Sequence, residues 1–336
     1  MKFRAGPALA AGLALAALTS CSSPPPLVPT SATDAEAIRD AVTERGVLAH
    51  VQALQSVADA EGGTRASGTS GYEESARYVE EQLREAGYEP VRQRFSYWND
   101  WNDEEVQSFN IVADSPGSDA QTVVVGGHLD SVAEGAGIND NATGVAAILE
   151  TAEWLAESGI EPSNRVRFAF WGGEEDGFYG SNHYVSELTG EQVDSTAVYL
   201  NLDMVGSPNG VRFVHDGDGS DSDRGGPKGS DVIEEVFLDY FAQNDLAAEP
   251  TSLDGGSDYE AFQDAGIAVG GLFTGDSGIK SDAEVRLHGG TAGREYDPCY
   301  HQGCDTLDNV DPTMLREMTA ALVFAARAFA VAPPPE

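Results

Sequence analysis

Residues 122–130 read TVVVGGHLD and residues 166–176 read VRFAFWGGEED. In both stretches a short apolar run is followed by two glycines and then by side chains that can bind a metal ion. Continuous apolar runs of this length are typical of strands buried on both faces of a sheet. Similar runs occupy 197–202, which Asp203 follows directly, and 268–273. Three successive predicted strands therefore each end next to a residue able to bind a metal.

The segments between these runs show helical periodicity. Apolar residues share one helical face over 145–155, and comparable patterns predict helices at 72–86, 232–243 and 312–329. Alternating strands and helices are typical of an α/β fold with a mixed, largely parallel central sheet and helices on both faces. We expect one globular domain over residues 35–332, with its site outside the carboxyl ends of the strands, where open α/β sheets bind ligands.

Three acidic residues are further candidate ligands at that edge. Asp140 stands just before the helix predicted at 145–155, where Asp is ordinarily an N-cap, and the same carboxylate could also bridge two metal ions. Glu174 and Glu175 would ordinarily lie in a solvated turn, but here they follow a buried strand and two glycines. Neighbouring carboxylates can point in different directions, one to a metal ion and the other to a water molecule, as metal-assisted hydrolysis requires.

The N-terminal segment predicts export. Lys2 and Arg4 precede a short apolar run, so residues 1–20 have the organisation of a signal peptide. The run ends in Leu-Thr-Ser-Cys, which resembles the lipobox of bacterial lipoproteins and makes Cys21 the expected lipidated residue; an ordinary signal peptide cut nearby is the alternative. Residues 21–34 are rich in proline and predict an extended tether. We expect a protein that is lipid-anchored at the outer face of a bacterial cell membrane, or secreted, and that touches the membrane only through its anchor.

A second feature that depends on export is the segment 297–304, DPCYHQGC. Two cysteines five positions apart in an exported chain, Cys299 and Cys304, predict a small disulfide loop, whereas free buried thiols would suit a cytosolic protein. Such a loop would fix the directions of Tyr300 and His301. The other histidines have no comparable acidic context in the sequence and are interpreted as surface or packing residues: His50, His183, His215 and His288.

The composition excludes one class of partner. Among 336 residues, 19 are basic and 56 acidic, and the net charge of -37 would repel the phosphate backbone of nucleic acids.

The most irregular stretch, 216–230, begins with an acidic and glycine-rich run that could suggest calcium. It lacks the Gly at position six and the Glu at position twelve of an EF-hand loop, so calcium is unsupported.

The motifs taken together resemble the secreted two-zinc aminopeptidases of the Streptomyces type, within the zinc exopeptidase family and its phosphorylase/hydrolase-like fold. The resemblance covers nearly all of the chain after the tether. Its matching segments follow one another in order: 127–131, 137–141, 171–175, 201–206, 270–275 and 299–305.

The resemblance implies a ligand set for two zinc ions. His128 and Asp203 would hold one ion, Glu175 and His301 the other, and Asp140 would bridge both. Imidazole and carboxylate are usual zinc ligands, so this set is also chemically reasonable by itself.

The resemblance further implies that Glu174 is the general base, that Tyr300 donates to the developing oxyanion, and that Asp130 orients His128. It also implies a cis peptide bond between Asp140 and Asn141. The residues that match a pocket for the first side chain are Met204, Gly255 and Phe273. One departure is Gly256, because related enzymes carry Arg in this loop.

The function implied is removal of N-terminal residues, preferably apolar ones, from peptides with a free N-terminus, by a monomer. A carboxypeptidase or dipeptidase of the same fold is the alternative among enzymes. A non-catalytic, lipid-anchored peptide-binding protein is the alternative from another class, but loss of catalysis would be expected to erode the ligands or Glu174, and all are present.

Overall fold

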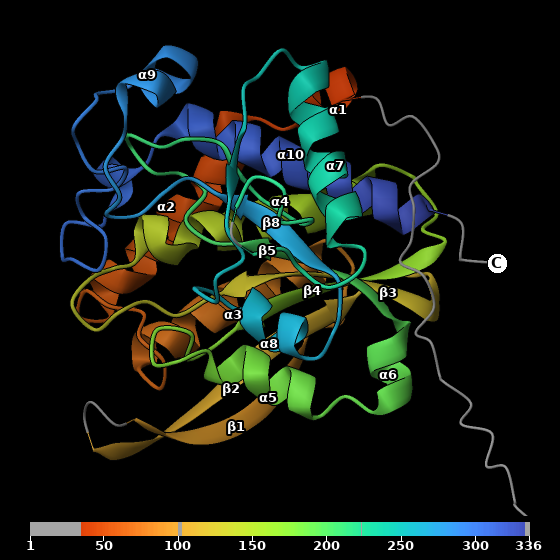
Figure 1. Ribbon diagram of the computed structural model, residues 1–336. Helices are drawn as coiled ribbons and strands as arrows, with labels where there is room; N and C mark the ends of the chain where they lie inside the picture. Colours follow the sequence, from red (N-terminus) through yellow and green to blue (C-terminus); the bar gives the residue numbers. More distant parts are fainter. Residues whose placement is uncertain (1–34, 100–102, 223, 333–336) are drawn as a thin grey trace, which may run out of the picture.

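The computed structural model describes residues 35–99, 103–222 and 224–332. The predictions for the signal peptide, the tether and the lipidated Cys21 lie outside these residues. One mixed sheet of eight strands runs through the molecule in the order β1-β2-β4-β3-β5-β8-β6-β7, with helices on both of its faces (Figure 1). The predicted α/β fold is confirmed.

The four predicted strands form the centre of this sheet, and neighbours among them pair in parallel. They are β3 (Ser118–His128), β4 (Asn164–Trp171), β5 (Thr196–Leu202) and β8 (Val269–Phe273). Val123 and Val125 pack into the larger hydrophobic core on one face, and Val124 packs into the smaller core on the other. Because both faces are covered, the apolar run is continuous rather than alternating.

Sequence analysis missed the outer strands, which are shorter or partly exposed and so lack a continuous apolar run. An antiparallel hairpin forms one edge of the sheet, with most of its first strand exposed or half-buried. Two three-residue strands form the other edge. These outer strands are β1 (Val91–Asn99), β2 (Glu104–Asp114), β6 (Phe213–His215) and β7 (Glu249–Thr251).

The larger helical layer covers the face that Val123 and Val125 contact. It confirms the four predicted helices as α3 (Ser70–Glu85), α4 (Thr143–Glu157), α7 (Ser230–Gln243) and α10 (Pro312–Val331), and it adds α1 (Ala35–Ala41) and α2 (Glu44–Ala60). The opposite face carries the short helices α5 (Tyr179–Ser186), α6 (Gly190–Ser195) and α8 (Tyr259–Asp264) (Figure 1). Helix α9 (Asp282–His288) has no buried residue. None of the helices in the described part of the chain has the length and hydropathy needed to cross a bilayer.

The start of α4 excludes the ordinary alternative for Asp140, an N-cap. Asp140 does not cap this helix: it lies in a π-helical turn, Ile138–Ala142, and has non-helical backbone angles. The next residue supplies the bond instead, because the side-chain oxygen of Asn141 accepts a 2.9 Å hydrogen bond from the backbone N–H of Gly144. The carboxylate of Asp140 is therefore directed elsewhere. The predicted cis peptide bond between Asp140 and Asn141 is present.

Candidate metal centre

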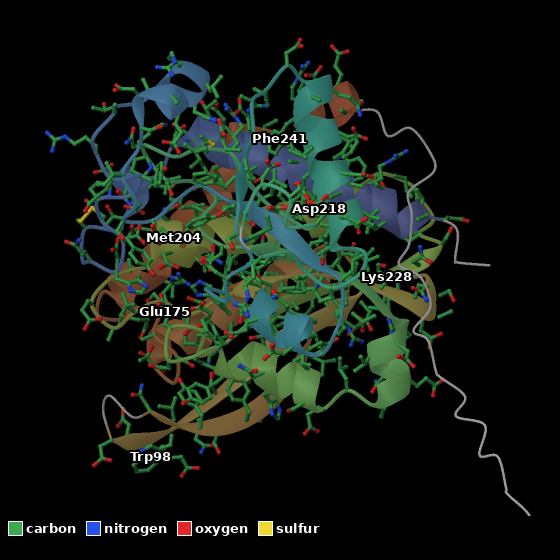
Figure 2. All side chains as sticks on the ribbon, viewed as in Figure 1. Trp98, Glu175, Met204, Asp218, Lys228 and Phe241 are labelled. Atoms are coloured by element: carbon green, nitrogen blue, oxygen red, sulfur yellow. A yellow bond between two sulfur atoms is a disulfide. The ribbon has the colours of Figure 1, made fainter. Side chains whose placement is uncertain are left out.

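The carboxyl ends of the three central strands meet at one edge of the sheet. His128 is the last residue of β3 and pairs in register with Trp171 at the end of β4, while Asp203 directly follows β5. A cavity of ≈ 230 Å³ opens at this edge, and Glu175 and Met204, both labelled in Figure 2, lie in its wall. The predicted site residues that line the cavity are Asp140, Glu174, Glu175, Asp203, Met204, Phe273, Tyr300 and His301.

Asp140 lies between two imidazole rings. Its Oδ1 is 3.1 Å from Nε2 of His128, and its Oδ2 is 3.2 Å from Nε2 of His301. Each imidazole also faces a second carboxylate: Nε2 of His128 lies 3.3 Å from Oδ1 of Asp203, and Nε2 of His301 lies 3.0 Å from Oε2 of Glu175. Two ligand atoms on one zinc ion in tetrahedral geometry are separated by about 3.3 Å. The five side chains thus make two half-sites that share one carboxylate.

The electrostatics of this cluster favour a bound cation. Burial raises the pKa of Glu175 to about 8, and the neighbouring charge of Asp140 adds to the effect. Oε1 of Glu175 is buried and has no hydrogen-bond partner among the described residues. Burial also tends to raise the pKa of Asp140, but hydrogen bonds to His128 and His301 bring it below its ordinary value. Crowded buried carboxylates are costly without a positive partner, and this donor set of imidazole nitrogen and carboxylate oxygen fits zinc.

Glu174 is buried beside this cluster, at 8% exposure. Burial raises the pKa of Glu174 well above its ordinary range; His128 opposes this shift, and Asp203 and Glu175 add to it. A ring nitrogen of His128 and one carboxylate oxygen each from Glu174 and Asp203 all lie within 4.8 Å of one another. A carboxylate with a raised pKa at this position is suited to accept a proton near neutral pH.

Asp130 is fully buried behind His128, but its contact differs from the predicted one. Nδ1 of His128 lies 3.2 Å from the backbone oxygen of Asp130 and 3.9 Å from its carboxylate. The carboxylate instead accepts a 3.3 Å hydrogen bond from the backbone N–H of Glu174. Asp130 therefore links the segment that carries His128 to the segment that carries Glu174.

Sequence reasoning gave Asp305 no role, although it stands next to Cys304. Its two carboxylate oxygens accept hydrogen bonds from the backbone N–H groups of Asn139, at 2.8 Å, and Asp140, at 3.0 Å. On the other side of Asp140, the side-chain amide of Asn141 donates to the backbone oxygen of Leu202 at 2.8 Å. Asp140 is thereby held between the segment after the disulfide and the end of β5.

The structural role of Arg65 was also not predicted from the sequence, because a single Arg in a loop belongs to no periodic pattern. It is fully buried, and its guanidinium donates to the backbone oxygens of Leu129, Ala136 and Gly137. Burial lowers the pKa of Arg65 to about 10, against the opposing charges of Asp130 and Asp305, so the group stays positive at neutral pH. It braces the loop that connects His128 to Asp140.

The predicted disulfide between Cys299 and Cys304 is present. Between the two cysteines, His301 has left-handed backbone geometry with φ 56°, which turns its ring toward Asp140. The ring of Tyr300 stacks on that of His301 with centroids 3.9 Å apart. Burial raises the pKa of Tyr300 above its ordinary value, and Asp140 and Asp203 add to this shift.

Two predictions outside the candidate ligand set need comment: the pocket for the first side chain and the acidic stretch. Met204 and Phe273 line the cavity as predicted, but Gly256 takes the place expected for Gly255. In the acidic stretch, the carboxylate of Asp216 accepts hydrogen bonds from backbone N–H groups, including those of Gly219 and Asp221. One oxygen each from Asp216, Asp218 and Glu234 also lies within 4.8 Å of the others, an arrangement that could hold a metal ion.

The histidines interpreted as surface or packing residues differ among themselves. His50 and His215 are both buried. The interpretation that His50 has no acidic context is wrong, because its ring lies against Glu150 and Glu153. Sequence reasoning missed this because the histidine and the two glutamates come from helices that are far apart in the chain.

Comparison with known proteins agrees with this geometry. The model of peptidase family M28 matches residues 110–326. Leupeptin-inactivating enzyme 1 of Streptomyces exfoliatus is 38% identical over 314 residues, which cover 93% of this chain and 68% of that protein. The probable lipoprotein aminopeptidase LpqL of Mycobacterium tuberculosis is 48% identical over 233 residues, which cover 67% of this chain but only 46% of that protein.

Among solved structures, an aminopeptidase from Aneurinibacillus sp. strain AM-1 has the same fold, with a TM-score of 0.71 at 16% identity over 90% of this chain and 98% of that one. This structural similarity supports the fold. The match to the family model and the identity to the Streptomyces relative establish which family the chain belongs to. The chain belongs to peptidase family M28.

Proposed function

We propose that this protein is a zinc aminopeptidase that removes N-terminal residues from peptides. The observation that carries the proposal is the position of Asp140, whose two oxygens face His128 and His301 at 3.1 and 3.2 Å in the wall of a cavity. Membership of the peptidase family and the names of the two relatives support the same activity.

Two zinc ions would be held by the two half-sites, His128 with Asp203 and His301 with Glu175, and Asp140 would bridge them. When bound, they would polarise the scissile carbonyl group and lower the pKa of the attacking water. The close N–O separations within each half-site support this assignment.

Glu174 would act as the general base. It takes a proton from the attacking water and later donates it to the departing amine, and its raised pKa makes it a stronger base than an ordinary glutamate. Tyr300 keeps its proton because its pKa is raised, so its hydroxyl can donate to the oxyanion that develops on the substrate. Asp130 would support both His128 and Glu174 from behind.

The acidic lining of the cavity supports attack at a chain end. Glu174, Asp203 and Asp276 all line it and can hold the ammonium group of a free N-terminus. A second cavity of ≈ 170 Å³ shares Asp203, Phe273 and Asp276 with the first and offers room for a side chain. Met204 and Phe273 favour an apolar first residue.

The same proposal places the enzyme outside the cell, as a monomer held by lipid on Cys21. The relative LpqL, named as a probable lipoprotein, supports the anchor. Replacing Cys21 by Ser should release the protein from membranes without changing hydrolysis by the folded domain. Equal membrane retention of the C21S variant would contradict the anchor and leave the activity unaffected.

The activity is tested with leucine p-nitroanilide, before and after chelation and again after zinc is restored. We expect hydrolysis that is lost on chelation and regained with zinc. Two matched peptides, one N-acetylated and one C-amidated, identify the end that is attacked. Cleavage of the N-acetylated peptide would favour a carboxypeptidase, and the absence of any cleavage would favour the peptide-binding alternative.

A further inference from the structure

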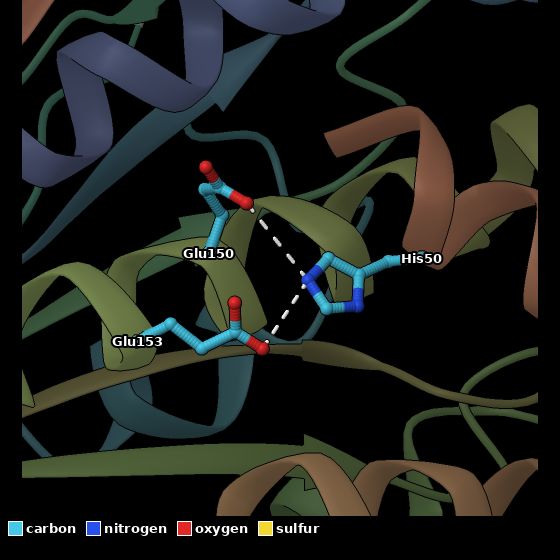
Figure 3. Close-up of side chains that lie close together, drawn as sticks. All are labelled: His50, Glu150 and Glu153. Atoms are coloured by element: carbon cyan, nitrogen blue, oxygen red, sulfur yellow. Dashed lines mark ion pairs between the residues drawn. The ribbon is translucent and has the colours of Figure 1, made fainter. Parts of the chain in front are cut away.

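A second group of metal-ligating side chains lies outside the candidate metal centre. Nε2 of His50, on α2, faces two carboxylates on α4: it is 3.5 Å from Oε1 of Glu153 and 3.9 Å from Oε2 of Glu150 (Figure 3). One ligand atom from each of the three residues lies within 4.8 Å of the others. Neither the mechanism nor the family match assigns this group a role.

The imidazole of His50 is held as a metal ligand usually is. The residue is only 4% exposed, and its Nδ1 makes a 2.7 Å hydrogen bond with the hydroxyl group of Tyr78, on α3. This bond fixes the ring and leaves Nε2 directed at the two glutamates, with no hydrogen bond of its own to any described residue. Histidine ligands almost always bond their other ring nitrogen to a second group in this way.

The gaps between these groups suit a shared ion better than direct contact. N–H···O hydrogen bonds are about 2.7–3.2 Å long. The distances from Nε2 of His50 to the oxygens of Glu153 and Glu150, 3.5 and 3.9 Å, are both too long for such a hydrogen bond. Two ligand atoms on one zinc ion lie about 3.3 Å apart in tetrahedral geometry, close to the His50 to Glu153 separation. Oε2 of Glu150 is farther from Nε2 of His50, at 3.9 Å, and would move closer on binding a shared ion.

The fold keeps space for this arrangement. Glu150 and Glu153 are three residues apart on α4 and so share one face of the helix. Gly46, on α2, lies against Glu150, and a Cβ atom at that position would come within 2.7 Å of its Oε1.

We propose that His50, Glu150 and Glu153 bind a further zinc ion, which joins α2 to α4 and plays no part in peptide hydrolysis. Three protein ligands leave one tetrahedral position open. Glu150 and Glu153 also line a surface groove of ≈ 550 Å³ together with Trp154 and Arg327, so a water molecule in this groove could occupy the fourth position. The site needs neither the half-sites at His128 and His301 nor the proposed activity.

The test measures bound zinc in the full chain over a range of buffered free-zinc concentrations. H50Q and E153Q should each bind one equivalent less than the native protein and should hydrolyse leucine p-nitroanilide at the native rate. E157Q is the matched control, because Glu157 lies on the same helix and lines the same groove but is outside the ligand group. It should keep the native zinc content. Unfolding midpoints in excess chelator show that all variants fold.

Tyr78→Phe provides a finer test, because it keeps the three ligands and removes only the bond to Nδ1. Affinity for the additional zinc should fall about tenfold to a hundredfold. The proposal is overturned if the native protein never binds more zinc than E153Q, which would leave a simple ion pair between His50 and the glutamates. It is also overturned if E157Q loses the same equivalent, because the effect would then be one of surface charge.

Discussion

Ser257 donates a 2.7 Å hydrogen bond to Oδ2 of Asp203, whose other oxygen, Oδ1, lies 3.3 Å from Nε2 of His128. The serine is itself held, because its hydroxyl accepts a 3.0 Å hydrogen bond from the side-chain amide of Asn201. The hydroxyl of Tyr199 in turn donates to the side-chain oxygen of Asn201 at 2.9 Å. A chain of buried polar side chains thus sets the direction in which Asp203 presents its Oδ1 to His128.

We expect Ser257→Ala to weaken zinc binding at the His128 half-site about tenfold to a hundredfold, as is usual when a partner of a metal ligand is removed. Zinc affinity and kcat/KM should fall together. Ser186→Ala, at an exposed serine on α5, is the control and should change neither. Unchanged zinc affinity in Ser257→Ala would show that Asp203 does not depend on this bond.

Glu174→Gln and Glu175→Gln separate the roles of two adjacent residues. Gln at 174 cannot accept a proton, so kcat should fall at least about a hundredfold while the zinc content stays native. Gln at 175 removes a ligand charge facing His301, so zinc should be lost from that half-site. Metal content and kcat must be measured on both variants. If Glu174→Gln loses zinc and Glu175→Gln keeps it, the two roles are exchanged.

Arg65→Met should destabilise the fold and disturb the metal centre. It would leave the backbone oxygens of Leu129, Ala136 and Gly137 without their buried donor. An unsatisfied buried group costs about 1–3 kcal/mol, so we expect the free energy of unfolding to fall by at least about 3 kcal/mol. Urea unfolding measures this. Arg77→Met, at a side chain 59% exposed, should cost little, and equal effects of the two substitutions would argue against the brace.

His215 should make stability depend on pH in the acidic range. Burial lowers its pKa to about 4, against an opposing hydrogen bond with the backbone of Gly271 and an ordinary value of 6.5. Between these two values the unfolded chain binds more protons, so this contribution is complete above about pH 6.5 and is lost as the pH falls toward 4. The full contribution of His215 to the free energy of unfolding is about 3 kcal/mol.

The measurement is the free energy of unfolding from pH 7 to pH 4 for the native protein and for His215→Phe, which cannot titrate. The difference in slope between the two proteins isolates this histidine from the many carboxylates that also titrate. Parallel curves would show that His215 is not protonated on unfolding.

Three of the five candidate ligands, His128, Glu175 and Asp203, were predictable from a local signature, because each lies at or just after the end of a buried strand. The run at Val123–Val125 is apolar at every position, since alternate residues face the two cores, and His128 must then lie where parallel strands end. The hairpin β1–β2 has no such run, because much of β1 is exposed. The ordinary alternative for Asp140, an N-cap, failed for a related reason: a cap is a local preference, and contacts from Asp305 and Leu202 hold this turn instead.

The sequence by itself determined the α/β fold class, the central strands and the candidate ligands at their ends, because buried strands and helical faces leave periodic patterns that neighbouring residues share. Only the tertiary structure decided how the ligands are held and which other groups assemble. Arg65 lies 64 residues from Leu129, and Asp305 lies 165 residues from Asp140. His50 likewise meets Glu150 and Glu153 only because α2 packs on α4. Single polar contacts between distant segments have no period, so they appear only when the chain is folded.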